Sequence, residues 1–586
     1  MDLTHDSGRI GLGGERRLFA ARLITGLIQG LALYALYFAG EHGLWPRTQP
    51  AVFGALALAA GYAPVVVLAG VGRLSPRTLA IWTASAALVL ALLGWHDVDR
   101  RVLDSWTQPP FLSFPTMAFG AAALFIAHHL IAPAARAGRW IAPYADYFDT
   151  AWKAGVQLAM SLAFTGTFWL LLHLGASLFG VIGIDALGDL LGQAWFAMPV
   201  LCLAFATAVQ LTDVRDGLIR GVRTVALMLL SWLLPVMAVL TAGFLAALPF
   251  TGLEGLWGTR SATALVLSAA AALIVLINTA YQDGRPDNRP PTALRWTARV
   301  GGVLLVPLVG LAFWGLMLRI GQHGLTPDRI IALACAGVGA VYAVGYLLAA
   351  VRRGDWMKPL ERTNLAAAVL SVVVILALFS PLLDPARLAV ADQTARLERG
   401  AVAAGDFDFD FLRFESGKAG RAALDRLTRS GDAQVAGLAQ AAKQRDRRVF
   451  DSPAELRRQA RDVRLVAVDG QTVPESFAAQ TQALSDLLIF CGREQACVLR
   501  RLDLDGDGRD EVLVATARMV MAFGQGGDGR WRALGRYASA CDPGARDRIE
   551  PDFRKGVATA PGALPDLVVG GRRMQLQPET RCEKAD

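Results

Sequence analysis

The residues best suited to chemistry lie in one short stretch, DLDGDGRDEVLV, at residues 503–514. Five of them offer oxygen ligands at the spacing of a cation loop: Asp503, Asp505, Asp507, Arg509 (through its carbonyl) and Glu511. Gly506 and Gly508 allow the backbone between the carboxylates to turn sharply. We expect calcium here rather than magnesium, which rarely uses all-protein cages. The alternative is an acidic turn that holds no metal.

The spacing begins like an EF-hand loop, but its twelfth position is Val514, where an EF-hand carries a bidentate glutamate. The residues that follow predict a strand rather than a helix. The stretch therefore resembles the calcium loops of integrin-type propeller repeats, whose pattern D-x-D-G-D-G-x-x-[DE] matches residues 503–511. A propeller needs several copies and this chain has one, so the resemblance implies the local loop alone.

Four of the six cysteines lie in the same C-terminal part of the chain: Cys491, Cys497, Cys541 and Cys582. In an oxidising compartment, four cysteines indicate two disulfides. A bond between Cys491 and Cys497 would close a small loop, and one between Cys541 and Cys582 would hold the C-terminal tail. Free thiols are the alternative.

The composition of the chain indicates the class of protein that carries the acidic loop and the cysteines. The chain has 586 residues, 54% of them hydrophobic and 18% charged, and its mean hydropathy is +0.39. These values are typical of a protein that crosses a membrane many times. The net charge of +8 comes mainly from arginines in short loops between apolar runs. We therefore expect the lipid bilayer, and no nucleic acid, as partner.

Eleven apolar runs are long enough to span a bilayer. They fall near residues 18–39, 51–71, 78–95, 114–132, 150–179, 194–211, 224–248, 261–281, 300–318, 330–351 and 365–378. The first run lacks a small-residue cleavage site, so we interpret it as a retained span.

Basic residues in the loops predict the orientation. One set of loops carries seventeen of them: Arg16, Arg17, Arg73, Arg77, Arg136, Arg139, Arg215, Arg220, Arg223, Arg285, Arg289, Arg295, Arg299, Arg352, Arg353, Lys358 and Arg362. The alternate loops carry five, or six with Arg319: Arg47, Arg100, Arg101, Arg260 and Arg329. Because basic loops stay in the cytoplasm, the N-terminus is predicted inside and the part after Ser380 exported.

The predicted fold is mainly α, a polytopic transmembrane helix bundle followed by an exported α+β domain. Residues 1–17 form a cytoplasmic tail, 18–380 the membrane domain with two-helix units of about 70 residues, 381–461 a helical periplasmic neck, and 462–586 a small β-rich periplasmic domain. Strand patterns in that domain are VRLVAVDG, EVLVATARMVMAF, RWRALGRY and LPDLVVGG, with GQGGDG as a hairpin turn. In the neck, FDFDFLRF alternates and predicts a strand or an extended arm.

Among the polar residues of the spans, His173 is the best functional candidate, because it lies far from the basic inner end of the run at residues 150–179. A hydrogen-bonded interfacial histidine is the plainer interpretation, and a proton relay the functional one. The other polar residues of the spans, His128, His129 and Asn278 among them, lie near the inner boundary, where water reaches them.

Five phrases carry a resemblance to a known family: FTGTFWLLLHLGASLFGVIGI, LPFTGLEGLW, INTAYQDG, FSPLLDPARLAVADQTARLERG and FDFDFLRFESGKAG. Together, from about Tyr144 to Leu424, they resemble bacterial inner-membrane proteins filed as domain of unknown function 4153. The resemblance implies a Gram-negative inner membrane. It implies no activity and no functional residue, because the family has no established activity.

Three classes of function remain. The first is a non-enzymatic envelope protein whose bundle anchors a calcium-stabilised periplasmic interaction domain, with an envelope protein as partner. The second is a transporter or lipid-handling protein, which the missing midplane carboxylates disfavour. The third is a membrane-embedded transferase. The chain has no G-x-S-x-G, Walker lysine loop, HExxH or CxxC, and no histidine after His323. These patterns favour the first class and predict no catalytic residue and no further cofactor.

Overall fold

The computed structural model describes residues 12–102, 112–214, 216–252, 262–445, 464–480, 491, 496–504, 506–515, 520–527, 529–537, 553–557, 567–569 and 572–574. The chain forms two compact units. The helical unit comprises Met1–Ala401 and Phe411–Lys443, and the sheet unit comprises Val402–Asp410 and Gln444–Asp586.

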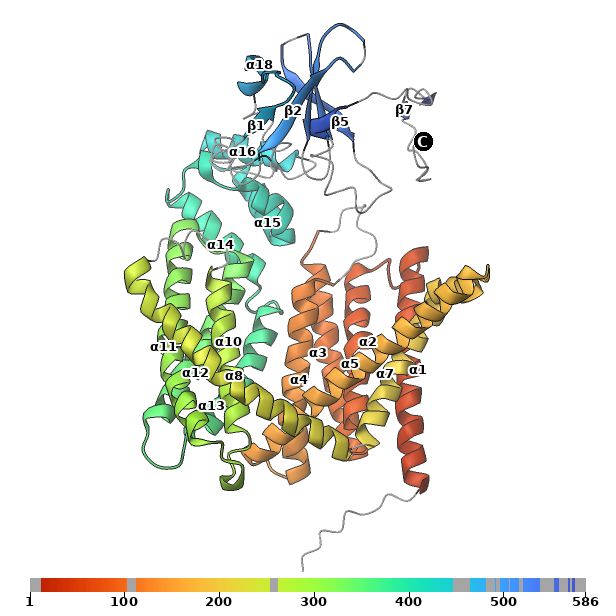
Figure 1. The fold of residues 1–586 in the computed structure, drawn as a ribbon, viewed down its shortest axis with the longest axis vertical. Coiled ribbons are helices and arrows are strands. Elements are labelled where there is room, and N and C mark those ends of the chain that lie inside the picture. Colours follow the sequence, from red (N-terminus) through yellow and green to blue (C-terminus); the bar gives the residue numbers. More distant parts are fainter. Residues whose placement is uncertain are drawn as a thin grey trace, which may run out of the picture. The chain divides into compact units, whose positions relative to one another are not determined.

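Eleven helices within the described residues are long and apolar enough to cross a membrane. They are α1 (Leu12–His42), α2 (Pro50–Gly70), α3 (Pro76–Asp99), α4 (Phe114–Ala137), α5 (Tyr144–Val181), α7 (Ala194–Val214), α8 (Asp216–Thr251), α10 (Ala262–Tyr281), α11 (Thr292–His323), α12 (Pro327–Val351) and α13 (Pro359–Leu378). The predicted spans are thus confirmed, and a short helix, α6 (Ala186–Gly192), connects α5 to α7. Helices α5 and α8 cross the other long helices obliquely (Figure 1).

Side-chain caps and glycines mark several helix ends. The Ser75 hydroxyl accepts a hydrogen bond from the Thr78 amide and caps α3, and Thr326 caps α12 through the Arg329 amide. Both helices have proline directly after the cap, where its missing N–H costs nothing. Helix α4 ends at Gly138, whose left-handed backbone (φ +61°) closes the last turn.

Small residues let neighbouring helices approach closely. Gly26 and Gly30 form a G-x-x-x-G pair on α1 that packs against α7, where a Cβ added at Gly26 would lie 2.7 Å from the Ala206 Cβ. A Cβ on Gly54 of α2 would lie 2.7 Å from the Gly94 carbonyl oxygen of α3. Close backbone approach of this kind is how membrane helices associate without a hydrophobic driving force.

Three shorter helices complete the helical unit: α14 (Pro385–Glu398), α15 (Gly417–Leu427) and α16 (Ala433–Lys443). Helix α14 packs on the connection between α11 and α12, where Asp392 accepts the Leu325 amide at 2.7 Å and Gln393 donates to the His323 carbonyl at 2.9 Å. Helix α15 contacts the end of α3, because the Lys418 amide donates to the Arg100 carbonyl at 2.9 Å. Part of the segment after the last span therefore packs on the bundle.

The FDFDFLRF run is not a strand, and that expectation was wrong. Residues Phe411–Glu415 form a π-helical turn that leads into α15. Phe407, Phe409 and Phe411 are buried, and so is Asp410, which pairs with Arg445. Burial of Asp410 breaks the period of two on which the strand prediction depended.

The sheet unit contains a five-stranded sheet in the order β1-β2-β3-β4-β5. Its strands are β1 (Leu465–Ala467), β2 (Cys497–Leu502), β3 (Glu511–Ala515), β4 (Val520–Gln525) and β5 (Trp531–Tyr537), with a helical turn, α18 (Glu475–Ala478), after β1. Only β1 and β2 are parallel, and the other neighbours are antiparallel. A separate pair joins β6 (Leu567–Val569) to β7 (Arg572–Met574).

The structure confirms the β4–β5 hairpin predicted at GQGGDG, corrects one strand expectation and adds one strand. EVLVATARMVMAF forms two antiparallel strands, β3 and β4, rather than one. Strand β2 was not predicted, because CVLRRL lacks an alternating pattern.

Apolar side chains cover both faces of this sheet. Leu499, Val514 and Phe523 lie in one buried cluster with Phe477 of α18, whose ring meets the Phe523 ring edge to face at 5.3 Å. Val498, Leu513 and Ala522 lie in a second cluster, with Phe553. Every residue of β3 is buried, so β3 is the centre of the unit's core.

Candidate functional site

The acidic loop connects β2 to β3. Leu502 and Glu511 are paired across the two strands, so residues 503–510 close the hairpin at the centre of the sheet. Gly506 and Gly508 have φ of +77° and +83°, the backbone region that favours glycine. The Asp503 carboxylate accepts the Gly506 amide at 2.7 Å with one oxygen and the Gly508 amide at 3.0 Å with the other. The turn expected from the sequence is present.

The other predicted ligands differ in exposure. Glu511 is 7% exposed, and its Oε2 accepts the Leu504 amide at 2.7 Å. Asp507 is exposed and accepts the Arg509 amide at 2.8 Å. Asp510, which is not a predicted ligand, pairs with Arg501 at 2.7 Å. The loop thus has a buried acidic end at Glu511 and an exposed one at Asp507.

Carboxylate and carbonyl oxygens suit a hard cation such as calcium. The Asp503, Asp507 and Glu511 carboxylates each accept backbone amides, and an ionised carboxylate has about four lone-pair sites in all. Asp505, the middle carboxylate, lies outside the described residues. Among the residues that are described, no three histidine, cysteine or acidic side chains converge as a metal cluster. Calcium binding by this loop therefore stays a prediction.

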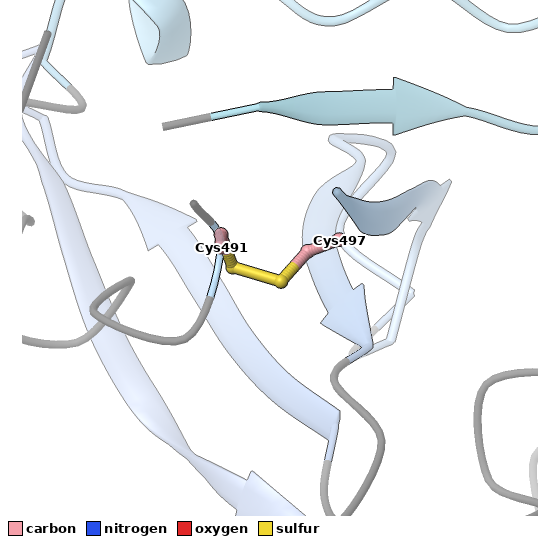
Figure 2. Close-up of a disulfide and its surroundings, with 2 residues drawn as sticks. All are labelled: Cys491 and Cys497. Carbon is pink, nitrogen blue, oxygen red and sulfur yellow. A yellow bond between two sulfur atoms is a disulfide. The ribbon is translucent and has the colours of Figure 1, made fainter. Parts of the chain in front are cut away.

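A disulfide joins Cys491 to Cys497 at the start of β2 (Figure 2). The flanking backbone is tied to the chain before β1, because the Arg464 amide donates to the Cys491 carbonyl and the Cys497 amide to the Arg464 carbonyl. Both cysteines are buried in the sheet core. The bond therefore supports the β1–β2 side of the sheet. Cys541 and Cys582 lie outside the described residues.

His173 lies on the surface of α5 with an exposed side chain. Its ring contacts the Trp169 ring one turn earlier, with centroids 5.8 Å apart. The Ser177 hydroxyl donates to the His173 carbonyl at 2.9 Å. Both of these contacts lie within α5 itself.

A buried charge cluster in the helical unit was missed from the sequence. Arg22 of α1 is 2% exposed and contacts Asp213 of α7 at 2.5 Å. Arg73, from the turn after α2, also pairs with Asp213. Arg22 donates to Gln210 as well, and Gln157 of α5 donates to the Val209 carbonyl. Arg22 lies inside the first predicted span, and arginine is rare enough there to have indicated the cluster.

Four amide and phenol side chains form a second, partly buried cluster. Asn364 of α13 donates to Tyr144 of α5 at 2.9 Å and to Asn278 of α10 at 2.6 Å. Tyr346 of α12 donates to Asn364 at 2.7 Å and accepts from Asn278 at 2.6 Å. Each group has partners, so the cluster joins four helices at low cost. Asn278 was noted in the sequence, but its partners come from distant segments.

A third cluster joins α3, α4 and the start of α14. Asp97 is 1% exposed and accepts the Ser113 hydroxyl, the Thr116 hydroxyl and Arg101. His96 Nε2 lies 3.1 Å from Asp384 Oδ2, and Asp384 caps α14 through the Ala386 amide at 2.8 Å.

Opposing effects act on the Asp384 carboxyl. Burial raises its pKa, but the His96 ring, the Arg100 charge and the Ala386 amide lower it by more. The pKa of Asp384 therefore lies below the ordinary aspartate value, and the carboxylate is charged at neutral pH.

Comparison with known proteins identifies the family. Residues 53–427, more than half of the chain, match the family described as Domain of unknown function (DUF4153). The chain belongs to this family. The match runs from within α2 to the end of α15, so the DUF4153 region makes up most of the helical unit. It includes the second and third polar clusters, and it includes Asp213 and Arg73 of the first, whose Arg22 on α1 lies outside the match. No curated protein and no solved structure matches the chain at a significant level.

Proposed function

We propose that this DUF4153 protein is a non-enzymatic anchor of the bacterial inner membrane that holds its C-terminal sheet in the periplasm as a calcium-stabilised interaction domain. The observation that carries the proposal is the position of the acidic loop. It closes the β2–β3 hairpin, and β3 is the central, fully buried strand. A cation that fixes this loop would stabilise the middle of the sheet.

Electrostatics explains why the cation would matter. Asp503 and Asp507 lie four residues apart in one tight turn, and Asp505 and Glu511 add two more negative charges to the same stretch of sequence. Without a cation these charges repel and the loop opens more readily. Binding to the folded state alone stabilises it by about 2.7 kcal/mol at a hundredfold excess of calcium over its Kd.

Two further observations support the periplasmic location. The loops on one side of the bundle carry seventeen basic residues against five or six on the other, which favours a cytoplasmic N-terminus and an exported C-terminus. The Cys491–Cys497 disulfide is the kind of bond that forms and persists in an oxidising compartment.

A partner protein would bind the sheet unit at an exposed surface. Strand β5 is last in the sheet order, and its Leu534 and Tyr537 are 61% and 57% exposed. Exposed apolar and aromatic side chains on an edge strand are typical of surfaces that add a strand or a loop from another protein. We propose β5 as the surface for an envelope protein.

Hydrogen exchange tests the calcium proposal on the full chain. The purified protein in detergent would be exchanged with calcium and with a chelator, and peptides covering residues 497–537 would be compared by mass spectrometry. We expect calcium to slow exchange in this region about a hundredfold, which corresponds to the stabilisation given above. Magnesium should give a much smaller effect.

Matched variants locate the effect. Asp503→Asn with Asp507→Asn should abolish the calcium-dependent protection. Asp510→Asn should retain it, because Asp510 lies in the same loop but pairs with Arg501. Equal exchange with calcium and chelator in the wild type would show that the loop is an ordinary acidic turn.

A specific observation supports the second candidate function, lipid handling. An apolar groove lies between α4 and α13.

A further inference from the structure

An apolar groove with a volume of about 1030 Å³ lies between α4 and α13 in the helical unit. Leu130, Ile131 and Ala134 line it from the last turns of α4, and Leu365, Val369 and Val373 line it from α13. Val369 and Val373 are 48% and 57% exposed, so the groove opens on the surface that faces lipid in a membrane. Its volume is at the upper end of the range for small-molecule sites, roughly 300–1,000 Å³.

The length of the groove matches one leaflet. From Arg362 to Val373 the lining runs along α13 for eleven residues, which is about 16 Å at 1.5 Å per residue. Half of a bilayer's hydrocarbon core is about 15 Å thick. The groove therefore extends from the interface to the midplane, the depth that an acyl chain of one leaflet occupies.

Positive charge is confined to one end of the groove. Arg362 lies in the first turn of α13 and Arg139 follows α4, both at the end of the bundle that carries the arginine-rich loops. Both side chains are exposed, and neither guanidinium has a hydrogen bond or ion pair with a residue that the structure describes. Among the described residues that line the groove, none is acidic.

This contrasts with other arginines of the helical unit, which are paired with carboxylates. Arg22 and Arg73 pair with Asp213, and Arg223 pairs with Asp149 at 2.9 Å. Beside Arg139, Trp140 is 97% exposed and Ile141 is 64% exposed. A tryptophan next to arginine at a helix end is typical of the interface between lipid headgroups and hydrocarbon. The two arginines thus lie where a lipid phosphate would be.

We propose that the α4–α13 groove binds one anionic diacyl glycerophospholipid, with its phosphate between Arg139 and Arg362 and an acyl chain along Leu365, Val369 and Val373. The apolar wall supplies burial for the chain, and arginine supplies paired N–H donors for the phosphate. The site is independent of the acidic loop. In the topology proposed above, the lipid belongs to the cytoplasmic leaflet.

Lipid titration of the purified full-length protein tests this site. Native mass spectrometry would measure retention of phosphatidylglycerol and of phosphatidylcholine with identical acyl chains. We expect the anionic lipid to be retained and the zwitterionic lipid to be lost. Arg139→Gln with Arg362→Gln should weaken phosphatidylglycerol binding about thirtyfold, since each basic residue near a lipid surface contributes about 1 kcal/mol.

Two controls separate the headgroup contact from the groove. Arg352→Gln with Arg353→Gln removes two exposed arginines from the same end of the bundle outside the groove, and should leave binding unchanged. Ala366→Trp fills the groove without changing charge, and should also abolish retention of the lipid.

Three results would overturn the proposal. Equal retention of both lipids would mean ordinary annular lipid. Competition by inorganic phosphate or glycerol 3-phosphate at the affinity of the lipid would mean an anion site without a role for the acyl chain. Unchanged binding in Ala366→Trp would place the lipid elsewhere.

Discussion

Asp213 is the carboxylate on which two arginines of the helical unit depend. It contacts Arg22 and Arg73, and Arg22 is 2% exposed. A buried charge pair adds little net stability when it is complete, because desolvation offsets the attraction. Removing one partner is costly, because the remaining charge is left in a medium that solvates it poorly.

Asp213→Asn should therefore destabilise the full-length protein by about 3 kcal/mol. The measurement is thermal unfolding of the detergent-solubilised protein followed by circular dichroism. Asp149→Asn is the matched control, because the Asp149–Arg223 pair is partly exposed and should contribute at most about 1 kcal/mol. Equal effects of the two substitutions would show that the Asp213 cluster has no special role.

Asp384 makes a pH-dependent contribution. Its pKa in the folded state lies below the ordinary aspartate value, so the charged form is favoured by folding. The resulting stability is fully present above the unfolded pKa, near 4, and is lost as the pH falls through the lower folded pKa.

Asp384→Asn should lower stability by about 2 kcal/mol at pH 7, and the difference from wild type should shrink towards pH 3. Chemical unfolding of both proteins at pH 7 and at pH 3 measures this difference in the free energy of unfolding. Asp425→Asn should have a much smaller effect, because the Asp425–Lys443 pair is exposed and screened by solvent. A difference at Asp384 that grew on acidification would contradict the assigned sign.

At the scale of helices and strands, the sequence predicted those elements whose formation depends on a local residue pattern. The eleven spans follow from length and hydropathy, and the β4–β5 turn from its glycines. FDFDFLRF was misread because the burial of Asp410 depends on its pairing with Arg445. The groove could not be predicted either, because Arg139 and Arg362 line one groove only when α4 packs on α13.

Close packing of α2 on α3 depends on Gly54. Its missing side chain makes room for Val98 and for the Gly94 carbonyl of α3. Gly54→Ala should destabilise the protein by about 1–3 kcal/mol, because the new methyl group has no space. Gly61→Ala in the same helix adds a methyl group with no atom within 4 Å, and should be neutral or slightly stabilising. Thermal unfolding of both variants compares them. A harmless Gly54→Ala would show that the two helices are not held so closely.

At the scale of the whole molecule, the chain combines a helical unit of the DUF4153 family with a sheet unit that carries the acidic loop and the disulfide. Hydropathy and cysteine position in the sequence predicted a helical membrane part followed by a C-terminal part with strands and disulfides. Family membership assigns the helical unit to a known family, but it identifies no catalytic residue. The function proposed here therefore depends on which side of the membrane the sheet unit occupies.

Reporter fusions to the full chain measure that directly. Alkaline phosphatase folds only in the periplasm, where its disulfides form, and green fluorescent protein reports the cytoplasm. With fusion after Lys584, we predict an active phosphatase and no fluorescence. With fusion after Arg285, in the α10–α11 loop, we predict the opposite. An inactive phosphatase after Lys584, together with fluorescence there, would place the acidic loop and the disulfide in the cytoplasm and contradict the proposed function.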